Sequence, residues 1–225
     1  MEKEQKFFKI VDPQGHHGLV YHNGYNEDPL PFNPSGDCEP GGIYFSSRDI
    51  FLFYDYGTEL YEVEPVGEIY ENPGEPKKYK AHALNMKYVG KIDEVNTIKY
   101  LLKNGADIHA DDDYALRSCV KKGYLKVVKY LIEQGADIHT RNDSSLRFAS
   151  EYGRLETVKY LVEQGANIHA NDDEALINAA LSRNLDVVKY LVEQGANIHV
   201  NNDEALRRSV EYDHLEVVKY LKTLY

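Results

Sequence analysis

The sequence contains no tryptophan, only two cysteines, and no proline after Pro76. Cys38 and Cys119 are too few for a disulfide framework or a four-ligand zinc site, so a reducing compartment is expected. No apolar run reaches the roughly 18 residues that a membrane-spanning helix needs. The N-terminal sequence MEKEQKFFKIVDPQG has no apolar stretch followed by a small-residue cleavage site, so no secretory signal is predicted.

Basic residues are also scarce relative to acidic ones. The chain has 26 Lys and Arg against 37 Asp and Glu, which gives a net charge of −11. Nucleic acids and anionic membranes favour basic surfaces, so neither is expected as the main partner. The 225 residues are 42% hydrophobic and 12% aromatic, which is enough for one or two folded domains with a core.

The composition changes near residue 80. All eight prolines and six of the seven phenylalanines fall in residues 1–80. The segment 71–78, ENPGEPKK, combines proline, glycine and charge, and is the expected joint between two structural units. We therefore predict one module over residues 1–80 and a second unit over residues 81–225.

The second unit repeats itself every 30 residues. Gly-Ala-(Asp/Asn)-Ile-His begins at residues 105, 135, 165 and 195, and Val-Lys-Tyr-Leu begins at residues 128, 158, 188 and 218. Self-similarity at a fixed period predicts stacked supersecondary units that bury a shared core. The expected units cover residues 81–109, 110–139, 140–169, 170–199 and 200–225.

Each unit is predicted to contain two helices joined by a turn. In residues 170–199, Asp173 precedes the first apolar helical face and is expected to cap that helix. The second helix carries Leu191 and ends at Gly195, a residue typical of a left-handed C-cap. Small residues recur on the first helix and predict close packing between units: Cys119, Ala149, Ala179 and Ser209.

The segment 155–167, LETVKYLVEQGAN, resembles the second helix and glycine turn of the ankyrin repeat. The resemblance covers about 145 residues and implies a mainly α solenoid of about five units. The period is 30 residues where the family usually has about 33. The family's Thr-Pro-Leu-His tetrapeptide is also missing, and Glu-Ala-Leu-Ile stands at residues 174–177. The deletion falls between Gly165 and Leu176, so the hairpin between units is expected to be a tight turn.

The short form of the repeat, VKYLVEQGANIH, is similar to the ankyrin proteins encoded by giant DNA viruses of amoebae. Segments like those of residues 1–80 precede the repeats in these viral proteins. The resemblance implies a viral origin and a host or viral protein partner. It also implies a location in the host cell cytoplasm or the virion.

The positions that vary between units cluster on the exposed side of the first helix and in the turn after it. In the family that the chain resembles, this side lines the concave surface that holds protein partners. Two interpretations stay open, a recognition groove with aromatic and arginine anchors or neutral surface positions that drift. We favour the groove because Phe148 and Leu181 are apolar where solvent would favour polar residues. The predicted protein-binding residues are Tyr114, Ser118, Lys122, Phe148, Glu151, Tyr152, Asn178, Leu181, Arg208, Glu211 and Tyr212.

One tyrosine and one histidine recur in every unit. The tyrosines are expected to form a structural ladder packed between units, beside a solvated row of lysines. Adjacent helices lie about 8–10 Å apart, so histidines of successive units cannot share one zinc ion, and bonds to turn backbone are expected instead. No metal site and no cofactor are predicted. The tyrosines are Tyr100, Tyr130, Tyr160, Tyr190 and Tyr220, and the histidines are His109, His139, His169 and His199.

Residues 1–80 predict a small β-rich module. Strands are expected at residues 17–24, which end in an Asn-Gly turn signal, and at residues 41–46, 51–54 and 61–64. The module is expected to act as a cap over the first repeat or as a second binding surface.

An enzymatic alternative rests on a faint resemblance of this module to ADP-ribosyltransferases. His17, Tyr44 and either Glu62 or Glu64 would then surround a nicotinamide. The module is too short for that family's usual fold and lacks its cofactor-loop pattern. We therefore favour a non-enzymatic protein-interaction scaffold over a small enzyme whose repeats act as a substrate adaptor.

Overall fold

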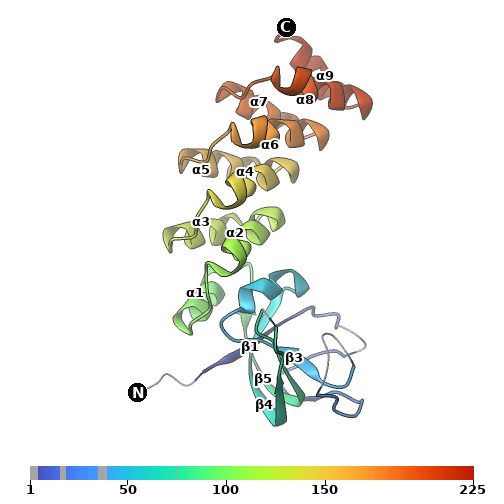
Figure 1. Cartoon of the computed structure of the whole chain (residues 1–225), viewed down its shortest axis with the longest axis vertical. Helices are drawn as coiled ribbons and strands as arrows, with labels where there is room; N and C mark the ends of the chain where they lie inside the picture. The colour runs from blue at the N-terminus through green and yellow to red at the C-terminus, as the bar shows by residue number, and fades with distance from the viewer. Residues whose placement is uncertain (1–4, 16–18, 35–39, 75) are drawn as a thin grey trace. The chain divides into compact units, whose positions relative to one another are not determined.

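The computed structural model describes residues 5–15, 19–34, 40–74 and 76–225. The chain divides into two compact units, Met1–Ala115 and Leu116–Tyr225. The first is built around a β-sheet and the second is a stack of helix pairs (Figure 1). Helix α2 (Ala110–Lys122) crosses the division. The expected architecture, a β-rich module followed by a helical repeat array, is confirmed.

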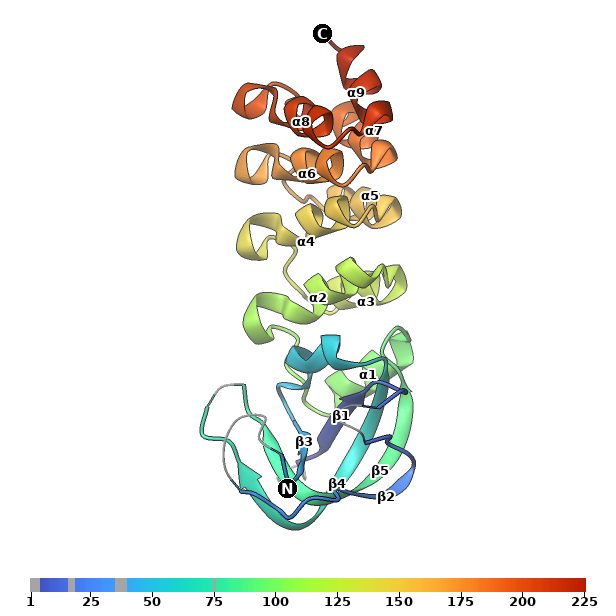
Figure 2. The same cartoon turned by 90° about the vertical axis from the view of Figure 1, so that its right-hand side faces the viewer.

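The first unit contains one antiparallel sheet. Its strand order is β1-β4-β5-β2, and β3 pairs with β5 beside this path. The longest pairing joins β4 and β5 from Glu59 opposite Lys91 to Glu71 opposite Tyr79. These two strands form a long, curved hairpin (Figure 2). The strands are β1 (Phe7–Val11), β2 (Gly24–Glu27), β3 (Ile43–Phe45), β4 (Glu59–Glu71) and β5 (Tyr79–Lys91).

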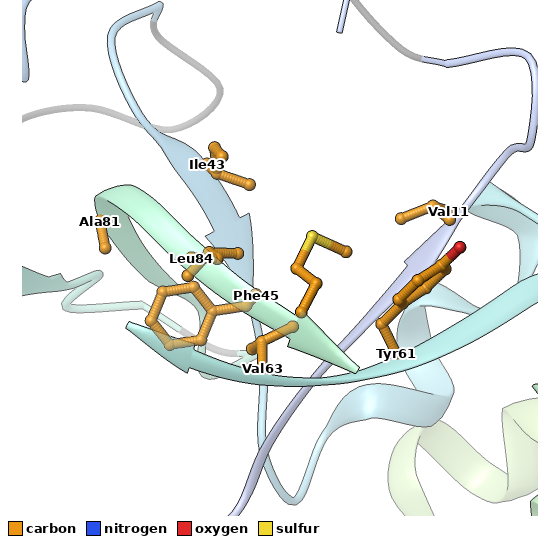
Figure 3. Packing of buried hydrophobic residues seen from close by; sticks show 8 residues of the cluster. Val11, Ile43, Phe45, Tyr61, Val63, Ala81 and Leu84 are labelled. Atoms are coloured by element: carbon orange, nitrogen blue, oxygen red, sulfur yellow. The ribbon is translucent and has the colours of Figure 1, made fainter. Parts of the chain in front are cut away.

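The core of this unit is an apolar cluster whose side chains converge from β1, β3, β4 and β5 (Figure 3). Removing such side chains from water is the main favourable contribution to folding. Phe7 extends the cluster through edge-to-face contact with Phe45, whose ring centroid lies 5.2 Å away. The buried members are Val11, Ile43, Phe45, Tyr61, Val63, Ala81, Leu84 and Met86.

The boundary predicted near residue 80 lies inside the sheet. Segment 71–78 is the β4–β5 turn, because the Asn72 N–H donates to the Lys78 carbonyl at 2.9 Å. Proline and glycine close a hairpin here and do not separate two domains. Residues 81–91, which we assigned to the first repeat, form most of β5, so this part of the expected unit 81–109 is wrong. The rest of that unit supplies helix α1 (Val95–Lys103).

Two of the four strands expected in the module are confirmed, at residues 41–46 by β3 and at residues 61–64 by β4. The strand expected at 51–54 is wrong, because these residues lie in a 3₁₀ helix, η1 (Ile50–Tyr56). Phe51 and Tyr54 are both fully buried, and their spacing of three residues fits one 3₁₀ turn. The strand expected at 17–24 is wrong over the described residues 19–23, which form no strand, and residues 17 and 18 lie outside the described part. The Asn-Gly pair at 23–24 leads into β2, which pairs with β5, so no tight hairpin forms there.

Tyr100 connects α1 to the sheet. Its O–H donates to Glu62 Oε2 at 2.5 Å, and Lys6 Nζ donates to the Tyr100 hydroxyl at 3.0 Å. Lys6 also lies 2.6 Å from Glu62 Oε1. Partial burial opposes the charge on Glu62, but the bonds from Lys6 and Tyr100 outweigh burial and lower the pKa of that carboxyl. The module and the first repeat helix are thus held in one unit.

The second unit has two layers of helices. Helices α4, α6 and α8 lie in one layer, and α3, α5, α7 and α9 lie in the other (Figure 2). Cys119, Ala149, Ala179 and Ser209 are fully buried, which confirms the close packing predicted from their size. The helices are α3 (Leu125–Glu133), α4 (Thr140–Glu151), α5 (Leu155–Glu163), α6 (Ala170–Leu181), α7 (Leu185–Glu193), α8 (Val200–Glu211) and α9 (Leu215–Lys222).

The shortened hairpin between units is a left-handed turn. Near the start of α2, α4, α6 and α8, three consecutive residues have positive φ, for example 53° at Asn171, 56° at Asp172 and 52° at Asp173. Eleven of the twelve residues in these triplets are Asn or Asp, and Arg141 is the exception. Asn and Asp tolerate this region better than other non-glycine residues. One left-handed turn therefore accounts for the short repeat, and the turn triplets are 111–113, 141–143, 171–173 and 201–203.

Candidate protein-binding surface

In two units, the aspartate that ends the left-handed turn bonds to the segment that follows the second helix of the same unit. Oδ1 of Asp173 accepts from the Asn197 N–H at 2.9 Å, and Oδ1 of Asp143 accepts from the Asn167 N–H at 3.0 Å. Both aspartates are buried. The prediction that this aspartate caps its own helix is therefore wrong, because the turn directs its carboxylate to the backbone N–H of Asn167 or Asn197 near the end of the same unit.

A histidine shares each of these aspartates. Nδ1 of His169 lies 3.0 Å from Asp173 Oδ1, and the backbone N–H of His169 donates to Asn167 Oδ1 at 3.0 Å. The same ring contact measures 3.1 Å, 2.9 Å and 2.8 Å at His109, His139 and His199. The expectation that the rings bond to turn backbone is wrong, since a carboxylate occupies Nδ1. Among the described residues, no three His, Cys, Asp or Glu side chains are grouped so as to hold a metal ion.

A third set of side chains caps the C-terminal end of the first helix of the preceding repeat. No pattern in the sequence predicted these caps. Arg154 Nη2 donates to the Lys121 carbonyl at 3.0 Å, and Asn184 Nδ2 donates to the Ser150 carbonyl at 2.8 Å. His214 Nδ1 lies 2.9 Å from the Ala180 carbonyl. These carbonyls belong to the last turn of a helix, which leaves acceptors unpaired. The three residue types differ, so only their shared capacity to donate could have revealed the column.

Most of the predicted protein-binding residues reach the surface, but Ser118 is an exception. Ser118 is only 2% exposed, whereas Phe148, Asn178 and Arg208 at the equivalent positions are half-buried, so the prediction is wrong there. Tyr114 belongs to the first unit, where its O–H donates to Asp55 Oδ2 at 2.6 Å. The second unit brings together the others on or after the first helices: Lys122, Phe148, Glu151, Tyr152, Asn178, Leu181, Arg208, Glu211 and Tyr212.

Charged and aromatic groups alternate on this surface. Lys121 Nζ lies 4.1 Å from the centre of the Phe148 ring, a cation–π distance. Arg208 lies 3.6 Å from Glu211, and the two side chains are 42% and 60% exposed. Tyr152 and Tyr212 occupy equivalent positions two repeats apart and are 48% and 54% exposed. The surface can therefore offer flat apolar contact area flanked by charge.

Comparison with known proteins places these features in a family. A profile of ankyrin repeats, in three copies, matches residues 86–172 and 146–224. The chain belongs to the ankyrin-repeat family. The ankyrin repeat protein R229 of Acanthamoeba polyphaga mimivirus is 33% identical over 138 residues, which cover 54% of this chain and 45% of that protein. Protein R869 of the same virus is 31% identical over 132 residues, which cover 54% of this chain and 93% of that protein.

The second helices of the ankyrin array carry the recurrent tyrosines. Tyr160, Tyr190 and Tyr220 are half-buried, and burial raises the pKa of each hydroxyl. Lys129 Nζ lies 4.9 Å from the centre of the Tyr160 ring in the next repeat, and Lys189 Nζ lies 5.9 Å from that of Tyr220. The tyrosines thus pack between repeats as expected. These two lysines cover the rings, which differs from the free solvated row that we predicted.

The residues of the enzymatic alternative are not brought together within the described part of the ankyrin protein. A hollow of about 270 Å³ on the first unit is lined by Glu62 and Glu64, but Tyr44 is not part of its lining. Glu62 is bonded to Lys6 and Tyr100, and His17 lies outside the described residues. In the described residues, no helix combines the length and the apolarity that crossing a bilayer requires.

Proposed function

We propose that this ankyrin-repeat protein is a non-enzymatic scaffold that binds a host or viral protein through the first helices of its repeats. The observation that carries the proposal is the pair Tyr152 and Tyr212, about half exposed at equivalent positions of alternate repeats. Tyrosine and arginine are enriched among residues that dominate binding energy, and both occur on this surface. The acidic net charge of −11 favours a protein over nucleic acid as partner.

The mimivirus relatives support a role in the host cell cytoplasm or the virion during infection. The chain spans about half the length of the first of these relatives, so the partner of that longer protein is not transferred to it. The β-rich module contributes by holding α1 through Tyr100, which keeps the first helix of the array in place.

Affinity capture from infected amoebae, followed by titration of the recovered partner, tests the proposal. Phe148→Ala, Tyr152→Ala and Arg208→Ala are combined in one full-length variant. Each hot-spot truncation typically costs about 2 kcal/mol or more, so the triple variant should lose the partner. The matched control combines Lys129→Ala, Lys159→Ala and Lys189→Ala on the second helices, where surface changes usually stay within about 0.5 kcal/mol. Loss of binding in the control alone would move the interface to the second-helix layer.

A further inference from the structure

Two tyrosines end the first helices of alternate repeats in the same backbone geometry. Tyr152 follows α4 with φ −87° and ψ 8°, and Tyr212 follows α8 with φ −100° and ψ 11°. Their N–H groups donate to the carbonyls four residues earlier, at 2.9 Å and 3.0 Å. Helices α4, α6 and α8 lie in one layer (Figure 2), and the two rings are 48% and 54% exposed. The rings therefore belong to one surface of the stack.

A glutamate precedes each of these tyrosines. Glu151 and Glu211 are the last residues of α4 and α8, and both are exposed. Within the described part of the chain, the Glu151 carboxylate makes no ion pair. Glu211 lies 3.6 Å from Arg208, and such an exposed pair is weak enough to be exchanged for a partner's cation. We define the Glu-Tyr sites as Glu151 with Tyr152 and Glu211 with Tyr212.

The helices add negative potential at both Glu-Tyr sites. Each site lies at the C-terminal end of a helix, where the partial charge of the carbonyls attracts cations. The turns 151–156, 181–186 and 211–216 carry net charges of −1, 0 and −3. The array itself uses an arginine in this way, because Arg154 Nη2 donates to the Lys121 carbonyl at the end of α2 at 3.0 Å. Each Glu-Tyr site thus combines an aromatic face, a carboxylate and a helix C-terminus, all of which favour a cation.

We propose that the two Glu-Tyr sites bind two arginine side chains of one extended segment of the protein partner. The inference rests on the proposed function, whose surface contains both tyrosines. A guanidinium stacks on aromatic rings and matches a carboxylate with paired donors, which suits each site. Packed helices lie about 8–10 Å apart, so sites two repeats apart are separated by about 16–20 Å. An extended chain advances about 3.3 Å per residue, so the two arginines should be about five or six residues apart.

The turn between the two sites restricts the middle of this segment. Residues 181–186 carry no net charge, and they present the exposed Arg183 and the half-buried Leu181. A basic residue in the middle of the segment would be repelled by Arg183, whereas an apolar residue can contact Leu181. The expected ligand therefore has arginines at its two ends and no basic residue between them. A continuous run of basic residues is not the expected ligand.

Fluorescence anisotropy of the full chain with a short labelled peptide tests the proposal. The probe carries two arginines at the predicted spacing and neutral residues elsewhere. Saturable binding is expected at about 0.1 M salt and should weaken toward about 1 M salt, because screening increases. A peptide with citrulline in place of both arginines lacks the charge and should bind at least about tenfold more weakly. A peptide with adjacent arginines can fill only one site and should also lose at least about tenfold.

Variants of the chain separate the contributions of ring and carboxylate. Tyr152→Leu with Tyr212→Leu keeps apolar area but removes both aromatic faces, and should weaken binding of the arginine peptide about five- to thirtyfold. Glu151→Gln with Glu211→Gln removes both carboxylates and should also weaken binding. The matched control is Glu163→Gln with Glu193→Gln, which makes the same charge change on the second helices and should bind like the unmodified chain.

Equal binding of the arginine and citrulline peptides overturns the proposal, and so does a chain that binds neither at about 0.1 M salt. The triple variant of the proposed function separates the two hypotheses. If the arginine peptide fails to bind while the triple variant still loses the captured partner, the basic segment is wrong and the proposed function stands. If the triple variant keeps the captured partner, the proposed function itself is wrong.

Discussion

Oδ1 of Asp173 accepts a hydrogen bond from the backbone N–H of Asn197 at 2.9 Å, and so ties the left-handed turn at the start of its repeat to the segment after the second helix. The same oxygen lies 3.0 Å from Nδ1 of His169, and the carboxylate is buried. Removing it deprives the Asn197 amide of this acceptor, and a hydrogen bond contributes about 0.5–1.5 kcal/mol net, or up to about 3 kcal/mol when its acceptor is charged.

Asp173→Ala is therefore expected to lower the free energy of unfolding by about 1–3 kcal/mol, measured by urea denaturation. Asp172→Ala is the matched control, because Asp172 has the same left-handed backbone, with φ 56° against 52°, but an exposed side chain. Alanine at positive φ is strained in both variants. The difference between their free energies of unfolding therefore isolates the contribution of the bond to Asn197. Equal losses in the two variants would show that this bond contributes nothing.

The leucine column of the second helices carries the core between repeats. Leu161 and Leu191 are fully buried. Leu161→Ala and Leu191→Ala should each cost about 2–5 kcal/mol, because each removes a large side chain from a packed interior. Leu215→Ala is the control, since Leu215 is 56% exposed and should change stability by less than about 0.5 kcal/mol. Chemical denaturation that places all three near the unmodified protein would contradict the stacked core.

One buried hydroxyl offers a stabilising change. Ser145 Oγ is buried and, within the described part of the chain, has no hydrogen-bond partner, whereas the equivalent residues are Ala115, Ala175 and Ala205. Ser145→Ala should raise the free energy of unfolding by about 1 kcal/mol, since it removes an unpaired polar group and favours the helix.

Ser150→Ala serves as the comparison, because Ser150 Oγ donates to the Leu146 carbonyl at 2.8 Å in the same helix. That change removes a satisfied hydroxyl and should bring no gain. A melting temperature that falls for Ser145→Ala would mean that its hydroxyl is paired in solution.

Lys9 gives the first unit a predictable dependence on pH. Burial lowers the pKa of its ammonium to about 8, and Nζ donates to the Tyr44 carbonyl at 2.8 Å. Because the folded-state pKa lies below the unfolded value of about 10.4, burying the charge destabilises the fold fully below pH 8. That destabilisation fades as pH rises from 8 toward 10, where the unfolded chain binds the extra proton.

Lys9→Met should therefore stabilise the protein at pH 7, and its advantage should shrink steadily up to pH 10. Denaturation of both proteins across this range measures the difference. Lys91→Met, at an exposed lysine of β5, is the control. An advantage that stays constant with pH would mean that Lys9 keeps its proton equally in both states.

The repeat array could be predicted because its determinants are local and recur in phase. Spacing alone identifies the positions that build the array. These are the leucine column that contains Leu161 and Leu191, the small residues, and the glycine after each second helix. The hairpin at 71–78 could not be recognised, because a Pro- and Gly-rich segment looks the same between strands and between domains. The pairing of Glu71 with Tyr79 that distinguishes them depends on the whole sheet.

The bonds made by the turn aspartates were missed for a related reason. Asp173 occupies a position that favours helix capping in sequence, and only the three left-handed residues redirect its carboxylate. Of the residues predicted to bind a partner, the large Tyr152 is exposed, whereas the small Ser118 is buried. Residue type alone does not reveal which side of a helix the stack encloses.

Each bond described between repeats joins a repeat only to its immediate neighbour, as Arg154 joins the Lys121 carbonyl and Asn184 joins the Ser150 carbonyl. Excising residues 140–169 would bring Asn184 to the place beside the Lys121 carbonyl that Arg154 holds now. Every donor would again meet an acceptor of the same kind. An unequal crossover between two such 30-codon units therefore changes the number of repeats and keeps the hydrogen bonds between repeats. A genome can in this way lengthen or shorten the protein by one repeat at a time.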